Sequence, residues 1–336
     1  MKPIAVSMGE PAGIGPEIIV KAWLARQDEA LPPFFVCGDG NALLDAKPRG
    51  AEFSIIALAA HGLNAMPDSL ESALPVCEAP LAVPARAGHL DPANARAVIF
   101  ALETATNACM QGHASALVTA PIQKSTLYDA GFEYPGHTEY LEARFAGAAQ
   151  APESLMLLAG GGLKVALVTI HVAIRDVAPL ITQAALMKKA RILHSALQKD
   201  FGIAQPRIAV AALNPHGGED GALGREEFEV IAPAVRGLIG TGLDASGPFP
   251  ADTLFHEQAR SKYDAVLCMY HDQALIPLKT LDFYSGVNVT LGLPIVRTSP
   301  DHGTALDIAG KGIADARSFI AALKLASEIA QRRGTA

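Results

Sequence analysis

Three short apolar runs in this chain each lead into polar residues that include a histidine. They are residues 163–171 (LKVALVTIH), 207–216 (RIAVAALNPH) and 263–273 (YDAVLCMYHDQ). Apolar runs of this length are typical of strands buried on both faces of a parallel sheet. Open α/β sheets bind ligands at the carboxyl ends of their strands. The pattern therefore predicts a parallel α/β protein whose site is built from strand ends.

The histidines of these runs, His171, His216 and His271, can meet at one point. Neutral imidazole is the commonest protein ligand of divalent transition metals, and three protein ligands leave a position open for substrate. A single histidine at a strand end is more often a surface or capping residue, but the repetition favours a catalytic metal site. Asp252 and Asp272 are candidate partners of the ligands or acid/base groups, although a turn or cap aspartate is the plainer interpretation of each.

The remaining segments alternate between apolar strands and amphipathic helices, which indicates βαβ units. Further strands are expected at residues 3–7, 34–38, 54–58, 114–119 and 288–293. Long helices are expected at about residues 93–111, 182–200, 225–238 and 314–331. A chain of 336 residues exceeds the size at which a single core stops growing, so two lobes are expected.

Composition excludes several classes of function. The net charge is −7 and no run of Lys or Arg occurs, which argues against nucleic acid as a partner. No apolar run approaches the roughly 20 residues of a membrane helix, and no signal-peptide pattern precedes the first strand. The four cysteines lie far apart without a CxxC pair, which is typical of a reducing cytoplasm.

Two motifs suit the binding of an anion. Residues 8–18 (MGEPAGIGPEI) join a strand to a helix, and their glycines allow close approach to a ligand, but a purely structural turn explains them equally well. They are not a GxGxxG fingerprint. His137 and Thr138 begin an expected helix in YPGHTEY, with Thr138 a plausible N-cap and His137 at the positive end of the helix.

Polar residues continue in apolar surroundings towards the C-terminus. Lys279, Asn288 and Arg297 suit a substrate that bears carboxylate or phosphate groups, whereas solvated surface charges are the plainer alternative. The glycine-rich residues 299–316 allow backbone amides to approach a flat ligand, against which His302 could pack.

Seven segments, in this order, resemble the 4-hydroxythreonine-4-phosphate dehydrogenase family of pyridoxal phosphate (vitamin B6) biosynthesis. They are MGEPAGIGPEI, PGHTEY, LNPHGGEDG, GPFPADTLF, MYHDQ, NVTLGLP and RTSPDHGTALDIAGKG. The last also resembles the cofactor loop of isopropylmalate and isocitrate dehydrogenases. The resemblance implies their two-lobed α/β fold, with a mostly parallel sheet flanked by helices and an active-site cleft between the lobes. It further implies NAD or NADP as cofactor and a homodimer with the active site at the subunit interface.

Residue roles follow from the same resemblance. It implies a cofactor lobe of residues 1–128 and 276–336, and a metal, substrate and dimerisation lobe of residues 129–275. His171, His216 and His271 would bind one divalent metal, Zn²⁺ or else Mg²⁺ or Co²⁺. The implied substrate contacts are His137, Thr138, Lys279, Asn288 and Arg297; the implied cofactor contacts are His302, Gly303, Asp307 and Gly310; the catalytic candidates are Asp252, Asp272 and Lys279. Ala173 and Ala274 stand where the family often has proline and glycine.

The implied reaction is metal-dependent oxidation of 4-phosphooxy-L-threonine at C3 by NAD or NADP. Decarboxylation to 3-amino-2-oxopropyl phosphate follows, on the route to pyridoxine 5′-phosphate. Two alternatives remain. One is a related dehydrogenase that acts on a phosphorylated tetronate. The other is an acyl- or phosphotransferase on a related fold, which would need neither the three histidines nor the cofactor-like loop.

Overall fold

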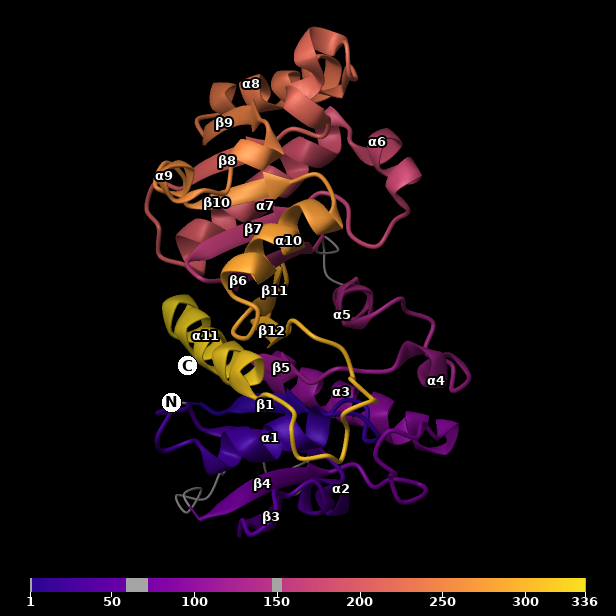
Figure 1. The fold of residues 1–336 in the computed structure, drawn as a ribbon. Coiled ribbons are helices and arrows are strands. Elements are labelled where there is room, and N and C mark those ends of the chain that lie inside the picture. The colour runs from indigo at the N-terminus through magenta and orange to yellow at the C-terminus, as the bar shows by residue number, and fades with distance from the viewer. Residues whose placement is uncertain (1, 59–71, 147–152, 336) are drawn as a thin grey trace. The chain divides into compact units, whose positions relative to one another are not determined.

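The computed structural model describes residues 2–58, 72–146 and 153–335, and Figure 1 shows their helices and strands. The chain forms two compact units: unit 1 is Met1–Pro152 with Leu293–Ala336, and unit 2 is Glu153–Gly292. Residues 129–146 thus belong to unit 1 and residues 276–292 to unit 2, the reverse of the division expected from the sequence. Each unit has a mostly parallel sheet flanked by helices, so the predicted α/β class is confirmed.

Unit 1 contains the sheet β3-β4-β2-β1-β5-β12, in which every described pairing is parallel. Its strands are β1 (Ile4–Ser7), β2 (Phe34–Gly38), β3 (Ser54–Leu58), β4 (Ala73–Glu78), β5 (Leu117–Thr119) and β12 (Arg297–Pro300). The bounds of β2 and β3 match the prediction. Strands β4 and β12 are not among the strands predicted from the sequence.

Helices cover this sheet with small apolar residues. They are α1 (Gly15–Leu24), α2 (Gly40–Asp45), η1 (Pro92–Asn94), α3 (Ala95–Met110), α4 (Lys124–Tyr128), α5 (His137–Phe145) and α11 (Arg317–Arg333). The buried positions of α3 recur every three or four residues and join one core cluster with Phe35 and Leu117. Thr298 Oγ1 donates to the Ala322 carbonyl at 2.9 Å and ties β12 to α11.

Unit 2 contains the sheet β11-β6-β7-β10-β8-β9. Its strands are β6 (Leu155–Gly160), β7 (Leu163–Leu167), β8 (Arg207–Ala211), β9 (Asp244–Phe249), β10 (Ala265–Cys268) and β11 (Val287–Leu291). Strands β7, β10, β8 and β9 are parallel, whereas β6 runs antiparallel to both of its neighbours. The carboxyl ends of these four parallel strands therefore share one edge of the sheet.

The helices of unit 2 are η2 (Ile174–Asp176), α6 (Val177–Leu180), α7 (Gln183–Lys199), η3 (Pro215–Gly221), η4 (Glu227–Ile231), α8 (Ala232–Gly240), η5 (Ala251–Thr253), α9 (Glu257–Arg260) and α10 (His271–Leu281). Helix α10 packs Ala274, Leu275 and Leu278 against Leu158 and Val165 of the sheet. This contact fixes the helix that begins at His271. Among the described residues, no helix is long and apolar enough to cross a membrane.

Candidate active site

The candidate metal ligands follow the carboxyl ends of three adjacent strands of unit 2. His171 lies after β7, His271 begins α10 directly after β10, and His216 lies in η3 after β8. Strand β10 pairs with both β7 and β8 in parallel, so the three chain segments leave the same edge of the sheet. Asp252 follows the fourth parallel strand, β9, and lies in η5 at the surface.

His171 and His271 lie next to each other. Their ring centroids are 5.6 Å apart and their planes are tilted by 42°. His271 Nδ1 is 2.7 Å from Asp272 Oδ1. A carboxylate at Nδ1 holds the proton on that nitrogen and leaves Nε2 as a lone-pair donor, which is the usual state of a metal-binding histidine. Asp272 is therefore placed to orient the imidazole ring of His271.

Two buried side chains, Thr169 and Gln273, join the carboxyl ends of β7, β10 and β8 by hydrogen bonds. Thr169 Oγ1 donates to the Met269 carbonyl at 2.7 Å, which joins the segment after β7 to the end of β10. Gln273 Oε1 accepts from the Met269 N–H, and its Nε2 donates to the Ala212 carbonyl, both at 2.7 Å. Gln273 thus joins the ends of β10 and β8. Gln273 is not among the predicted site residues, although a polar side chain beside apolar residues in the first turn of a helix is a usable signal in the sequence.

His216 does not join the other two histidines in the described structure. Within residues 2–58, 72–146 and 153–335, no three His, Cys, Asp or Glu side chains form a group that could hold a metal ion. His216 is exposed and has a φ of 51°, within a run of left-handed residues from 216 to 221. The strand-end pattern could not anticipate this backbone conformation. The two remaining imidazoles and Asp272 have the donor chemistry of a partial site for a transition metal.

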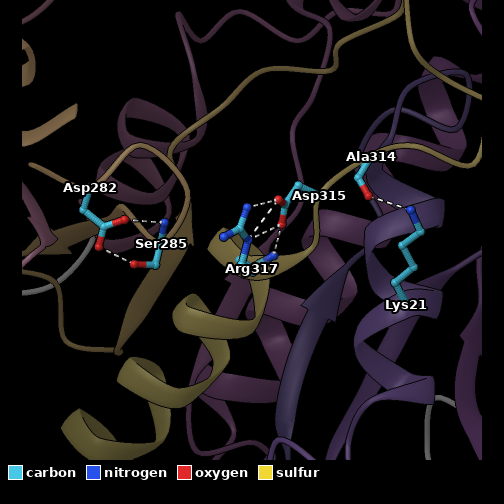
Figure 2. A network of polar contacts seen from close by, with 6 residues as sticks. All are labelled: Lys21, Asp282, Ser285, Ala314, Asp315 and Arg317. Carbon is cyan, nitrogen blue, oxygen red and sulfur yellow. Dashed lines mark hydrogen bonds and ion pairs between the residues drawn. The ribbon is translucent and has the colours of Figure 1, made fainter. Parts of the chain in front are cut away.

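Lys279 and Asn288 lie on either side of one turn. Lys279 is near the end of α10, and Asn288 lies in β11 opposite Leu158, so its side chain is on the sheet face that α10 covers. Asn288 Oδ1 is buried and finds no hydrogen-bond partner among the described residues. Asp282 holds the turn between α10 and β11, because its carboxylate accepts from the Ser285 N–H at 2.9 Å and from the Ser285 hydroxyl (Figure 2). The same carboxylate accepts from the Gly161 N–H at 3.0 Å.

The hydrogen bonds from Ser285, and first among them that of its hydroxyl, lower the pKa of Asp282. The carboxyl is therefore ionised at neutral pH and keeps the turn closed between Lys279 and Asn288.

Unit 1 contains the candidate anion-binding residues Arg297, His137 and Thr138. Arg297 begins β12, is only 3% exposed, and donates from Nη2 to Thr119 Oγ1 at 2.7 Å. This burial excludes a solvated surface charge. Helix α5 begins at His137 with Gly136 as its N-cap and without a side-chain cap bond, so the expectation that Thr138 is the cap was wrong. The helix begins two residues earlier than a Thr138 cap would place it, and its first N–H groups form the positive end of the helix.

Burial lowers the pKa of both Arg297 and His137. Burial lowers the pKa of Arg297 to about 10, and the nearby Glu139 opposes this shift. Burial first, and then the charges of Arg297 and Lys124, lower the pKa of His137 well below its ordinary value. His137 is therefore neutral at pH 7, and its Nε2 is buried with no hydrogen-bond partner in the described part of the chain. The buried guanidinium of Arg297 near a buried imidazole nitrogen of His137 suits a bound anion.

Residues 299–316 pack against the glycine-rich loop that begins α1. The Thr304 carbonyl accepts from the Ile14 N–H at 2.9 Å, and a Cβ on Gly13 would lie 2.8 Å from the same oxygen. Lys21 donates to the Ala314 carbonyl at 2.6 Å, and Arg317 pairs with Asp315 at 2.6 Å (Figure 2). The loop is therefore anchored at its middle and at its end.

A cavity of about 320 Å³ lies between these two loops. Its lining includes Pro11, Gly13, Pro16, Lys47, Gly310 and Lys311. Of the predicted cofactor residues, Gly310 lines this cavity, whereas Gly303 and Asp307 are exposed. His302 is half-buried, and its Nε2 has no hydrogen-bond partner among the described residues. The cavity has room for part of a nucleotide.

Comparisons with known proteins agree with these features. Pyridoxal phosphate biosynthetic protein PdxA, a protein family, matches residues 30–326. A 4-hydroxythreonine-4-phosphate dehydrogenase of Caulobacter vibrioides is 52% identical over 335 residues, which cover 99% of both chains. One from Bradyrhizobium diazoefficiens is 49% identical over 98% of this chain and 97% of its own. The crystal structure of such an enzyme from Klebsiella pneumoniae has a TM-score of 0.83 at 37% identity, and covers 98% of this chain and 100% of its own.

Proposed function

Since the chain belongs to the PdxA family of pyridoxal phosphate biosynthetic proteins, we propose that it is a 4-hydroxythreonine-4-phosphate dehydrogenase. It oxidises 4-phosphooxy-L-threonine at C3 with NAD or NADP, and the 3-oxo acid then loses carbon dioxide to give 3-amino-2-oxopropyl phosphate. The adjacent rings of His171 and His271 at the ends of parallel strands carry this proposal, because they provide donors for a divalent metal where an α/β sheet binds its substrate.

The proposed metal ligands are His171, His271 and His216. The first two are adjacent and Asp272 orients one of them, whereas His216 has to approach from the η3 loop. Zn²⁺ is the preferred assignment because imidazole suits it, with Co²⁺ or Mg²⁺ as alternatives. A divalent ion bound there lowers the pKa of a coordinated hydroxyl and stabilises negative charge on an enolate oxygen.

The substrate carries a phosphate and a carboxylate, and both units offer groups that bind such anions. In unit 1, we assign anion binding to Arg297, His137 and Thr138, where the uncapped N-terminus of α5 adds its own N–H donors. In unit 2, we assign it to Lys279 and to the side-chain amide of Asn288, whose buried Oδ1 has no hydrogen-bond partner among the described residues. Within each unit, these groups fix the orientation of the anion that they bind.

Proton transfer needs a base near the C3 hydroxyl. Lys279 and Asp252 are the candidates, since Asp272 is engaged by His271. When C3 is oxidised, its hydride passes to the nicotinamide ring and its hydroxyl proton passes to this base. After carbon dioxide leaves, the base returns a proton to the carbon of the enolate.

We place the adenosine part of NAD or NADP in the cavity between the two loops of unit 1. Gly310 and Gly13 let the backbone approach the cofactor, and His302, Gly303 and Asp307 lie on the same loop. Three cations, Lys47, Arg49 and Lys311, line the cavity beside two carboxylates, Glu17 and Asp45, and the cations suit the phosphates of the cofactor.

The proposed assembly is a homodimer in the cytoplasm with the site at the subunit interface. Large apolar side chains are exposed directly beside the two histidines: Val172 and Ile174 follow His171, and Ile276 lies one turn after His271. Exposed apolar surface of this kind is typical of a subunit interface. The free cysteines Cys37, Cys77, Cys109 and Cys268 are consistent with a reducing compartment.

The test of the proposed function is steady-state turnover with two substrates. 4-Phosphooxy-L-threonine and a phosphorylated tetronate are each supplied with NAD and with NADP, and reduced cofactor is measured. The proposal predicts a higher kcat/KM for the amino-acid substrate. Preference for the tetronate would instead identify a related sugar-acid dehydrogenase.

A further inference from the structure

The carboxylate of Asp282 lies directly after the last residue of α10, where the negative end of the helix disfavours it. Three hydrogen-bond donors hold it there. Its Oδ1 accepts from the Ser285 N–H at 2.9 Å, and its Oδ2 accepts from the Ser285 hydroxyl (Figure 2). Its Oδ2 also accepts from the Gly161 N–H at 3.0 Å, in the turn between β6 and β7. One side chain thus joins the turn of residues 282–285 to the β6–β7 turn.

The β6–β7 turn also packs closely against the segment after α10. A Cβ on Gly161 would lie 3.2 Å from the Cβ atoms of Asp282 and Leu281. A Cβ on Gly160 would lie 3.2 Å from Gly286 Cα. Contacts this close leave no room for a further carbon atom, so a displacement of one turn is passed on to the other.

Phe283 lies inside the turn that Asp282 holds, and it contacts Lys279. The Phe283 side chain is 67% exposed, and Lys279 Nζ lies 5.7 Å from the centroid of its ring. This distance is within the range of a cation–π contact. Both side chains line a cavity of about 530 Å³, and His271 and Thr280 line the same cavity. The ring therefore restrains the ammonium group of Lys279 beside the cavity that His271 also lines.

We infer that Asp282 is a positioning residue for Lys279 and acts through Phe283, an inference that rests on the anion-binding role proposed for Lys279. Asp282 fixes the turn, the turn places the ring of Phe283, and the ring restrains the ammonium group. A lysine side chain loses conformational freedom when it binds an anion, so a restraint that exists beforehand lowers the cost of binding.

Two substitutions disturb the turn from opposite sides. Asp282→Asn keeps the size of the side chain but replaces one acceptor oxygen with an NH₂ group, so at least one of the three donors loses its partner. Loss of this negative charge would by itself strengthen the binding of an anion. Weaker binding in Asp282→Asn therefore isolates the positioning effect. Gly161→Ala leaves the carboxylate intact, but its Cβ meets Asp282 and Leu281 at 3.2 Å.

Each of these variants has a matched control. Gly161 and Gly162 have positive φ values of 55° and 76°, so an alanine bears backbone strain at either position. A Cβ on Gly162 meets nothing within 4 Å, and Gly162→Ala therefore leaves the turn after α10 in place. Asp244→Asn removes another carboxylate of unit 2, which is exposed at the start of β9.

Substitutions of Phe283 test the second step. Phe283→Leu removes the aromatic face, whereas Phe283→Tyr keeps it and should restore wild-type binding. A cation–π contact at an exposed site corresponds to a factor of about 2 to 5 in a binding constant. Phe283→Leu should therefore raise the Kd for the substrate by about this factor.

The experiment is calorimetric titration of the full-length protein with 4-phosphooxy-L-threonine in the presence of Zn²⁺. Asp282→Asn and Gly161→Ala should each raise the Kd by up to the same factor as Phe283→Leu. Gly162→Ala and Asp244→Asn should match the wild type. The double variant Asp282→Asn/Phe283→Leu should bind like Phe283→Leu alone, because both substitutions remove the same contact. Circular dichroism shows which variants are folded.

Unchanged or tighter binding in a folded Asp282→Asn or Gly161→Ala variant would overturn the inference, even if the melting temperature fell. Losses that add in the double variant would also overturn it, because Asp282 would then act by a route other than Phe283. If one of the two turn variants does not fold, the other decides the question against its control. A wild-type protein that does not bind 4-phosphooxy-L-threonine would overturn the proposed function and this inference together. Normal wild-type binding with unchanged variants would overturn this inference only.

Discussion

The imidazole rings of His171 and His271 lie with their centroids 5.6 Å apart, although 99 residues separate them along the chain (271 − 171 − 1). They meet because β7 and β10 are adjacent and parallel, with Val165 opposite Val266. The hydrogen bond from Thr169 to the Met269 carbonyl then keeps the two segments together beyond the sheet. Sheet topology therefore brings the two candidate ligands together before any metal binds.

Substitutions at His171, His271 and Asp272 should distinguish a metal ligand from a residue that only orients a ligand. His171→Ala and His271→Ala should each lower the affinity for Zn²⁺ more than Asp272→Asn does. The loss in Asp272→Asn should be about 10- to 100-fold, because Asp272 acts only through the Nδ1 of His271. Calorimetric titration of the metal-free protein measures all three. The exposed His256→Ala is the control and should bind Zn²⁺ like the wild type. An equal affinity for His271→Ala and His256→Ala would remove His271 from the metal site.

Anion binding should be coupled to protonation of His137. In the folded protein its pKa is held well below the ordinary value by burial and by two cations. The unfolded chain therefore takes up a proton near pH 6.5 that the folded protein does not, so His137 lowers the stability progressively as the pH falls below about 6.5. A bound phosphate offsets the cations and raises the pKa of His137.

Calorimetry of substrate binding in two buffers of different ionisation enthalpy measures this coupling at pH 6. Proton uptake in the wild-type protein should exceed that in His137→Gln. Identical proton uptake in both proteins would show that His137 does not sense the anion.

Arg297 should contribute to substrate binding and leave the metal site unaffected. A charge-assisted hydrogen bond contributes about 1.5–3 kcal/mol, so Arg297→Ala should raise KM by roughly 10- to 100-fold. Metal content, measured on the purified variant, should stay at the wild-type value. Thr119→Val removes the hydrogen bond to Arg297 and keeps the charge, so it should have a smaller effect. A folded Arg297→Ala variant with wild-type KM would exclude the assigned role.

Two glycines of the cofactor loop offer a matched comparison. Gly310 and Gly312 both have a φ of 72° and both line the cavity. A Cβ on Gly310 would lie 2.5 Å from Ala87 Cβ, whereas a Cβ on Gly312 meets nothing within 4 Å. Both alanine variants bear the same backbone strain, but only Gly310→Ala displaces the loop. NAD binding, followed by fluorescence, should therefore weaken more in Gly310→Ala. Equal affinities would argue against this cavity as the cofactor site.

Several apolar strands could be predicted closely from the sequence because each is a short, unbroken hydrophobic run, whether it is fully buried like β2 or lies at the exposed edge of the sheet like β3. Residues 34–38 and 54–58 have the expected bounds. Strand β12 reads Arg-Thr-Ser-Pro and escapes any hydropathy pattern, yet all four residues are buried. Arg297 and Thr298 of this strand make tertiary hydrogen bonds to Thr119 Oγ1 and to the Ala322 carbonyl, which no local pattern encodes.

The candidate site, too, could be predicted only in part from the sequence. A histidine at the end of a buried strand has its position set by the sheet, so the pairing of His171 with His271 followed from the pattern. His216 lies in a loop of residues with positive φ, and the entry to this loop is hydrogen-bonded to Glu227 of a later helix, so no strand pattern predicts the position of His216. In the sequence, Glu226, Glu227 and Glu229 look alike, and only the fold shows which of them is buried.

The most direct test of the proposed reaction is to measure both of its products, reduced cofactor and carbon dioxide, with and without metal. The wild-type protein is treated with a chelator, dialysed, and supplied with 4-phosphooxy-L-threonine and NAD or NADP, before and after Zn²⁺ is restored. Reduced cofactor and carbon dioxide are measured together. The account predicts that neither forms in the metal-free protein and that both return in equal amounts with the metal. Full activity in the metal-free protein, or reduced cofactor without carbon dioxide at completion, would contradict it.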